Sequence, residues 1–138
     1  MKKNWEHYSH TADMGIRGFG ESMEEAFESA ALAMVAVNVD LEKIKHEEKV
    51  TIICSEDDIE LLFIAWLNNL LYEMVTRKMF FGKFQVNIKD GQLTGFAWGE
   101  KIDLKRHEPG VEIKGISYSD LKVIHENGKW TAQCIVDI

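Results

Sequence analysis

The stretch that most restricts the fold of this chain is residues 55–78, SEDDIELLFIAWLNNLLYEMVTRK. Its apolar residues recur at intervals of three and four, which is the period of an amphipathic helix. The members of this stripe are Ile59, Leu62, Phe63, Trp66, Leu67, Leu70 and Met74. Other apolar residues make the segment apolar nearly all round, which is typical of a helix at the centre of a fold. Ser55 is a candidate N-cap, so we expect a central helix over about 56–77.

A second helix is indicated by SMEEAFESAALAMVAV, which begins at Ser22. Ser22 followed three residues later by Glu25 has the spacing of a capping box, in which each side chain bonds to the backbone N–H of the other residue. The apolar residues of this segment form one stripe, and Glu24, Glu28 and Ser29 lie on the opposite side. The pattern predicts an amphipathic helix over about 22–37 that covers another layer of the fold.

The rest of the chain resembles β-strands, some with the two-residue alternation of a half-buried strand. Asp90-Gly91 and Asn127-Gly128 each stand between strand-like segments and predict tight hairpin turns. The sequence contains no internal repeat and no linker. We therefore predict one α+β domain over residues 1–138, in which mostly antiparallel β structure packs with two main helices, about 22–37 and 56–77.

The charged residues restrict the choice of partner. The 16 basic and 23 acidic residues give a net charge of −7. Because nucleic-acid binding depends on neutralising phosphates with Lys and Arg, this balance argues against direct binding to nucleic acid. It permits docking on a basic protein surface, although many acidic proteins do no such thing.

Cysteine usage and hydropathy indicate the compartment. Cys54 and Cys134 lie in apolar stretches and form no Cys-x-x-Cys pair, so we expect buried free thiols. The N-terminal segment lacks the apolar stretch of a signal peptide. Residues 59–72 are interrupted by Asn68 and Asn69 and are too short to cross a bilayer. We expect a cytoplasmic protein that does not bind membranes.

The residues that could carry chemistry lie near the two ends of the sequence. His7 and His10 are three apart in a strand and should face opposite sides, and the histidines lack the spacing of a zinc site. Asp13, Asp137 and the α-carboxylate of Ile138 are hard oxygen ligands, which suit a divalent cation such as calcium or magnesium. On this pattern alone the alternative is stronger, because carboxylates near chain ends usually just face water.

Five segments stand in the order and spacing of a known family: HTADMGIRGFGESMEEAFESAALAM, DDIELLFIAWLNNLLYEM, GEKIDLKRH, EIKGISYSDLKV and CIVDI. Together they resemble the archease family, whose members are small accessory proteins of RNA ligation. The resemblance runs from about residue 6 to 138. Its most specific feature is H-T-A-D near the N-terminus combined with a final D-I.

The resemblance implies a protein cofactor and not an enzyme, with no catalytic residues of its own. Archeases activate the RtcB-type RNA ligase of tRNA splicing, a step of tRNA processing, by promoting guanylylation of the ligase and its multiple turnover. The resemblance also implies a divalent-metal site at Asp13, Asp137 and Ile138, with calcium as the ion and magnesium or manganese as alternatives. Lys114 matches a lysine important for activation. His10 is expected to shape the Asp13 loop by a hydrogen bond and not to bind the metal.

The sequence departs from the family pattern at two positions. Ser119 stands where many members have histidine, so we assign it no role, and Gly115 replaces the commoner alanine. Glu100, Asp103 and His107 are expected to form an exposed polar face that touches the partner, or only a solvated hairpin. Two further functions stay open: a metal-dependent phosphoester hydrolase, because clustered acidic ligands can activate water, and a general chaperone or interaction module with a structural ion.

Overall fold

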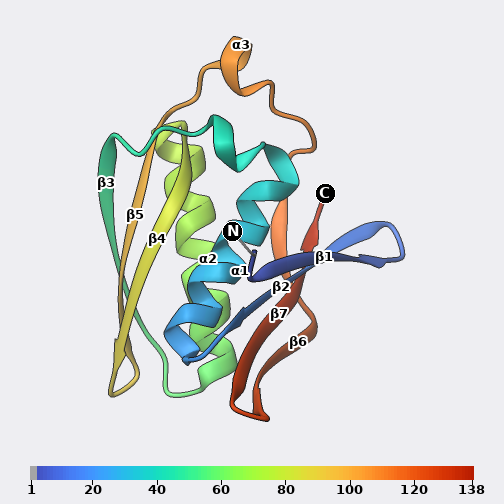
Figure 1. The fold of residues 1–138 in the computed structure, drawn as a ribbon, viewed down its shortest axis with the longest axis vertical. Helices are drawn as coiled ribbons and strands as arrows, with labels where there is room; N and C mark the ends of the chain where they lie inside the picture. The colour runs from blue at the N-terminus through green and yellow to red at the C-terminus, as the bar shows by residue number, and fades with distance from the viewer. Residues whose placement is uncertain (1–2) are drawn as a thin grey trace.

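The computed structural model describes residues 3–138, which form two antiparallel sheets with two helices between them (Figure 1). The first sheet has the order β1-β2-β7-β6, from β1 (Trp5–His10), β2 (Asp13–Gly20), β7 (Lys129–Asp137) and β6 (Gly115–Glu126). The second has the order β3-β5-β4, from β3 (Glu48–Ser55), β5 (Gln92–Lys101) and β4 (Met79–Lys89). The predicted α+β fold with mostly antiparallel β structure is confirmed.

The two main helices are α1 (Met23–Asn38) and α2 (Ile59–Arg77), close to the predicted ranges. Ser22 caps α1 as predicted, because its side chain accepts a hydrogen bond from the backbone N–H of Glu25. The predicted cap of α2 is wrong. Ser55 is the last residue of β3, and the cap is Asp58, whose carboxylate accepts from two backbone N–H groups. Two short elements, η1 (Leu41–Lys43) and α3 (Leu104–His107), were not predicted.

Both helices contact both sheets. α1 packs on β2 and β7 of the first sheet and on β4 of the second, and α2 packs on β6 and on β3 and β4. The buried residues of α2 are Leu62, Phe63, Ile64, Trp66, Leu67, Leu70 and Met74. This set contains nearly all of the predicted stripe, because the helical period correctly identified the side that meets the sheets.

The other side of α2 is open. Leu61, Tyr72 and Val75 are exposed, although the predicted central position of the helix between the two sheets is confirmed. Among the described residues, α2 is the one helix long and apolar enough to cross a membrane by length and composition, a test that a buried core helix also meets. In this fold its buried stripe is instead part of the hydrophobic core between the sheets.

Two hairpins complete the β structure as predicted. Asp90 and Gly91 join β4 to β5 with φ of 51° and 76°, and Asn127 and Gly128 join β6 to β7 with φ of 53° and 73°. Two successive positive φ values give the backbone the twist of a tight hairpin, which is why Asp-Gly and Asn-Gly are strong signals for this turn.

The two cysteines are free thiols. Cys134 is fully buried, and burial raises its pKa to about 12, whereas Cys54 is only half-buried. The predicted buried thiols are therefore confirmed in full for Cys134 alone.

Candidate functional site

The first sheet brings the two predicted aspartates side by side. The β1–β2 hairpin places Asp13 at the start of β2, opposite His10. The next residue of β2, Met14, pairs with Val136, so Asp13 lies beside Asp137 at the end of β7. Residues directly opposite each other in antiparallel strands point to the same face. His10, Asp13 and Asp137 therefore form one row across three strands, which we call the carboxylate row.

Lys114 lies at the end of this row, just before β6. Its backbone N–H donates a hydrogen bond of 2.7 Å to the backbone oxygen of Asp137, and its side chain is exposed. The following residue, Gly115, pairs with Asp137. Figure 1 shows the last strand ending between the β1–β2 hairpin and the start of β6. Three segments far apart in the sequence therefore meet where β7 ends.

Ile138 follows Asp137 directly and is half-buried against the hydrophobic core. Because apolar contact holds this side chain in place, the backbone of Ile138 is kept next to the carboxylate row. Asp137 itself is exposed and Asp13 is half-buried. The carboxylates of the row are thus accessible from solvent.

The histidines of β1 lie on opposite faces, as predicted. His7 points to α1, where its Nε2 lies 2.7 Å from the backbone oxygen of Ala33. His10 points to the carboxylate row, but its buried Nδ1 has no hydrogen-bond partner. The expected hydrogen bond of His10 to the Asp13 loop is thus not made by this nitrogen. A buried polar atom without a partner is rare, and it marks a place where a ligand atom or a water could bond.

The carboxylate row fits a divalent cation in part. Asp13 and Asp137 offer carboxylate oxygens, the ligands that calcium and magnesium prefer. Among residues 3–138, however, no group of three or more His, Cys, Asp or Glu side chains is placed to hold a metal ion. The donor set fits a hard cation in its chemistry, but side chains alone supply only two carboxylates. A third carboxylate would have to come from the backbone of Ile138.

A polar network lies beside the row on the same face of the sheet, and sequence analysis missed it. The Tyr8 hydroxyl donates a 2.8 Å hydrogen bond to the Asp120 carboxylate, which also accepts one of 3.0 Å from the Gln133 amide. Arg17 Nε donates to the Gln133 carbonyl oxygen at 2.8 Å. Burial, followed by the hydrogen bond to Asp120, raises the pKa of Tyr8. The network ties β1, β2, β7 and β6 together next to the candidate site.

Gly15 makes room for this network. A Cβ on Gly15 would lie 2.4 Å from the ring of Tyr8, so a larger residue would push the ring away. The feature of the sequence that could have indicated this close contact is the glycine itself, two positions after Asp13 and on the same face of β2, because a glycine inside a strand often marks a close approach by another group.

The residues expected to form an exposed polar surface are partly buried, so that expectation is wrong for two of them. Glu100 is 5% exposed and His107 is 1% exposed, whereas Asp103 is exposed. His107 Nε2 lies 2.8 Å from Glu100 Oε2, and the backbone N–H of Lys45 donates to the same oxygen at 2.7 Å. The other oxygen of Glu100 accepts from the Arg106 guanidinium.

This cluster fixes one end of the segment that leads to Lys114. Burial of Glu100 opposes ionisation, but the hydrogen bonds from Arg106, Lys45 and His107 outweigh it and lower the pKa of Glu100 to about 2. Further along, the backbone N–H of Gly110 donates a 2.7 Å hydrogen bond to Asn38. Residues 102–114 are therefore anchored at several points before they reach the carboxylate row.

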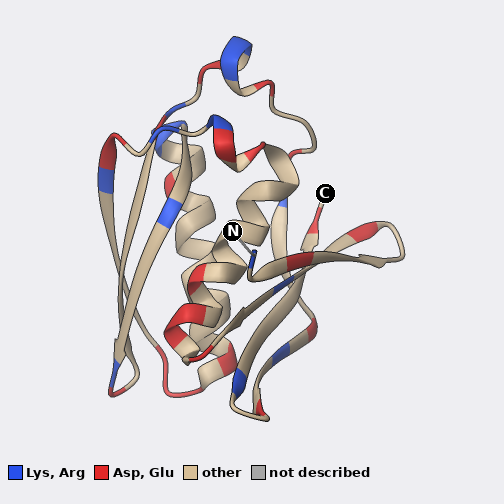
Figure 2. Cartoon of the chain, viewed as in Figure 1, with Lys and Arg blue, Asp and Glu red and all other residues tan. Residues whose placement is uncertain are grey.

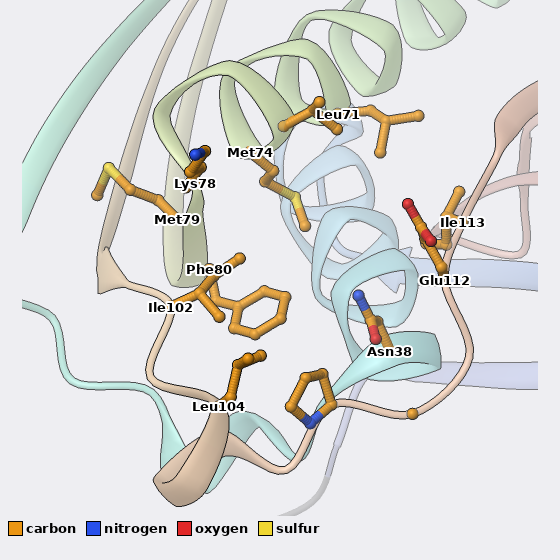
Figure 3. Close-up of a pocket in the computed structure, with 13 residues that line it drawn as sticks. Asn38, Leu71, Met74, Lys78, Met79, Phe80, Ile102, Leu104, Glu112 and Ile113 are labelled. Atoms are coloured by element: carbon orange, nitrogen blue, oxygen red, sulfur yellow. The ribbon is translucent and has the colours of Figure 1, made fainter.

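A pocket of about 330 Å³ lies under this segment (Figure 3). Its lining is mainly apolar and comes from the end of α2, the start of β4 and residues 102–113, including Met74, Phe80 and Ile102. Of the described residues that line it, none belongs to the carboxylate row. The predicted site thus lies at the open ends of the central strands β2 and β7, where a macromolecule can make contact, and not in this pocket.

Comparisons with known proteins identify the family of this chain. The model of the Archease protein family (MTH1598/TM1083) matches residues 5–138. Protein archease of Pyrococcus furiosus is 45% identical over 141 residues, covering 99% of both chains, and that of Methanosarcina mazei is 38% identical, covering 99% of this chain and 97% of the relative.

Solved structures are also similar. The solution structure of Methanobacterium thermoautotrophicum protein 1598 superimposes with a TM-score of 0.86 at 34% identity, covering 99% of this chain and 100% of that one. A crystal structure described as an archease, possible chaperone, from Thermotoga maritima has a TM-score of 0.63 at 21% identity, covering 95% and 94%, and supports the fold alone. The family model and the curated relatives match essentially the whole length, so this chain belongs to the archease family.

Proposed function

We propose that this protein is a metal-binding accessory protein that activates an RtcB-type RNA ligase. It would promote guanylylation of the ligase and so restore multiple turnover in tRNA splicing, without being a ligase itself. The proposal rests on the archease resemblance and on membership of that family. It places the protein in the cytoplasm with its partner ligase.

The observation that carries the proposal is the meeting of Lys114 with Asp13 and Asp137 at one end of the strands of the first sheet. The backbone bond from Lys114 to Asp137 and the register of β2 with β7 bring these residues together from both ends of the sequence. The same three positions are those that the family resemblance selects.

Lys114 is the residue best placed to act on the partner. Its side chain is exposed, and its backbone bonds to Asp137. An ammonium group on a flexible stem can reach a carboxylate or phosphate of another molecule. We therefore assign Lys114 to contact with the ligase or with its nucleotide.

The metal of the proposal would be held by Asp13, Asp137 and the backbone carboxylate of Ile138. A bound divalent cation would neutralise the repulsion between these like charges and so hold the end of β7 against the start of β2. Calcium is the proposed ion, with magnesium or manganese as alternatives. His10, which lies opposite Asp13, would support that strand end without being a ligand.

Two other functions are weaker. A phosphoester hydrolase would need an oriented general base beside the metal. The candidate in the row is His10, opposite Asp13, and its buried Nδ1 has no hydrogen-bond partner that would orient the ring for this role. A general chaperone is suggested by the description of the Thermotoga maritima protein as a possible chaperone. Chaperones commonly expose apolar surface, and here the open side of α2 offers Leu61, Tyr72 and Val75.

An assay of ligase guanylylation separates the three functions. Purified ligase is incubated with limiting GTP, with and without this protein, and both guanylylated ligase and joined RNA are quantified. The proposal expects more guanylylated ligase and several turnovers per ligase molecule. Hydrolysis of phosphate esters by this protein alone would favour the hydrolase, and suppression of aggregation without stimulation would favour the chaperone.

A further inference from the structure

One face of the β3-β5-β4 sheet is not covered by either main helix. α1 and α2 both lie on the other side of this sheet (Figure 1). The register of the three strands puts four rows of residues on the uncovered side, which we call the outer face. The rows are Lys49, Trp98 and Lys83; Thr51, Phe96 and Gln85; Ile53, Thr94 and Asn87; Ser55, Gln92 and Lys89.

The charge of the outer face is opposite to that of the whole chain. Its charged residues are Lys49, Lys83 and Lys89, and the four rows contain no Asp or Glu, although the net charge of the chain is −7. Figure 2 shows the lysines of β3 and β4 along the strands, with acidic segments toward the strand ends. Glu48 and Asp90 are two of these flanking acids. The outer face is a basic, polar strip on an acidic protein.

Two aromatic rings lie at the centre of this strip. Phe96 and Trp98 are two residues apart on β5, and their ring centroids are 6.2 Å apart. Lys49 Nζ lies 5.1 Å from the centroid of Phe96, and Lys83 Nζ lies 4.8 Å from that of Trp98. Both aromatic residues are half-buried and both flanking lysines are exposed. Each ring therefore has a mobile cation beside it at the protein surface.

We propose that the outer face binds single-stranded nucleic acid, with bases stacked on Phe96 and Trp98 and phosphates bound by Lys49 and Lys83. Aromatic rings that accept bases, together with lysines that follow the backbone, are the two components of single-strand binding surfaces. Each lysine would move from its ring to a phosphate when a base takes its place. The inference stands independently of the proposed action on a ligase.

Spacing favours a single strand over a duplex or a protein. Residues i and i+2 of a strand are about 6.6 Å apart, whereas bases in a duplex strand are spaced about 3.4 Å apart. Two bases of an extended single strand can thus each meet a ring, and paired bases cannot. An acidic protein surface would use Lys49 and Lys83 but would gain nothing from two separately spaced rings.

The expectation of no nucleic-acid binding came from the net charge, which averages over the whole surface. Binding by a strip with only three lysines is weak and depends on salt, because each phosphate contact changes the slope of log K against log salt by about 0.7 for single strands. We expect a dissociation constant of about 10–100 µM at low salt, within the range of nonspecific binding.

The test uses a fluorescein-labelled 12-residue oligouridylate and measures fluorescence anisotropy between 50 and 200 mM salt. Lys49→Gln/Lys83→Gln should weaken binding about fivefold and reduce the salt slope by about 1.4. The matched control, Lys101→Gln/Lys105→Gln, removes the same charge from exposed lysines off the outer face and should bind like the wild type.

Phe96→Leu/Trp98→Leu keeps apolar side chains but removes the rings, and it should weaken binding at least about fivefold. Thermal melting monitored by circular dichroism checks that each variant is folded.

Two competitors distinguish recognition of single-stranded nucleic acid from general electrostatic attraction of an acidic polymer to the lysines. A polyglutamate peptide of matched charge and a duplex of the same length should displace the oligouridylate only at much higher concentration. The inference is overturned if the wild type does not bind, if polyglutamate competes equally well, or if the control lysines matter as much as Lys49 and Lys83. It is also overturned if folded Phe96→Leu/Trp98→Leu binds like the wild type.

Discussion

The backbone N–H of Lys114 donates a hydrogen bond of 2.7 Å to the backbone oxygen of Asp137. Because both atoms belong to the main chain, this bond places Lys114 beside the carboxylate row without using its ammonium group. The Lys114 side chain is left exposed and free to meet another molecule. A substitution at residue 114 can therefore remove the ammonium group while the backbone hydrogen bond to Asp137 stays in place.

Replacing Lys114 by alanine should impair ligase activation and leave folding intact. Surface substitutions away from special features usually change stability by no more than about 0.5 kcal/mol. Lys114→Ala should thus unfold in urea at the same midpoint as the wild type, while guanylylation of the ligase falls to near the unstimulated level. Lys105→Ala, an exposed lysine on α3, is the control and should stimulate normally. Full stimulation by Lys114→Ala would remove this residue from the activating surface.

Replacing either aspartate of the row by asparagine should abolish binding of the cation. Asparagine keeps the shape of the side chain but loses the charge that a hard cation requires. Isothermal titration with calcium should give heat for the wild type and none for Asp13→Asn or Asp137→Asn, and both variants should activate the ligase poorly. Asp57→Asn, an exposed carboxylate before α2, should bind calcium normally. Normal calcium binding by both row variants would contradict the proposed site.

Two glycines on the same face of the first sheet should respond differently to alanine. A Cβ on Gly15 would lie 2.4 Å from the Tyr8 ring, so Gly15→Ala must displace that ring and its bond to Asp120. We expect a loss of about 1–3 kcal/mol, as for overpacking. A Cβ on Gly115 would lie 3.6 Å from Asp137 Oδ2, an ordinary contact, so Gly115→Ala should be tolerated. Urea denaturation of both variants checks this, and equal stabilities would argue against the close contact at Gly15.

The local pattern of apolar and polar residues predicted both main helices and the two hairpin turns. The features that it missed depend on contacts between residues far apart in the sequence. Both helices were predicted because their apolar period depends only on neighbouring residues. The local pattern favours Ser55 as the cap because it does not show that β3 extends through Ser55 and that Asp58 caps α2. Glu100 and His107 were expected at the surface because their partners include the backbone of Lys45, far away in sequence.

In the candidate site, too, the local features could be predicted from the sequence and the long-range ones could not. Strand alternation alone placed His7 and His10 on opposite faces, because that property is local. The proximity of Asp13 and Asp137 depends on the pairing of β2 with β7, which no local signal fixes. The sequence suggested that Asp13 and Asp137 lie close together through the family resemblance, and not through the spacing of these residues. The network of Tyr8 and Asp120 was missed for the same reason, since its members come from distant strands.

The Glu100 cluster should make stability depend on acid pH. The pKa of Glu100 is lowered from 4.5 to about 2 in the folded protein. A lowered folded-state pKa stabilises the fold above the unfolded-state pKa, and this contribution is lost as pH falls from about 4.5 through 2. The stability difference between wild type and Glu100→Gln should therefore shrink as pH falls from 6 to 2, measured by urea denaturation. A difference that does not change with pH would show that Glu100 titrates normally.

Adding residues after Ile138 should abolish cation binding while both aspartates remain. An amide bond at Ile138 replaces its carboxylate, and the row then offers only the two side-chain carboxylates of Asp13 and Asp137. Among residues 3–138 no group of three or more His, Cys, Asp or Glu side chains is placed to hold a metal ion, so no such group can take over binding when the terminal carboxylate is lost.

A Gly-Ser-Gly extension at the C-terminus is therefore expected to bind calcium far more weakly, by isothermal titration, and to activate the ligase poorly. The same three residues at the N-terminus are the control and should leave both properties unchanged. Thermal melting in the presence of a chelator should be alike for the two extended proteins, because the side chain of Ile138 still packs on the core. If the C-terminally extended protein binds calcium and activates the ligase as the control does, the terminal carboxylate is not a ligand.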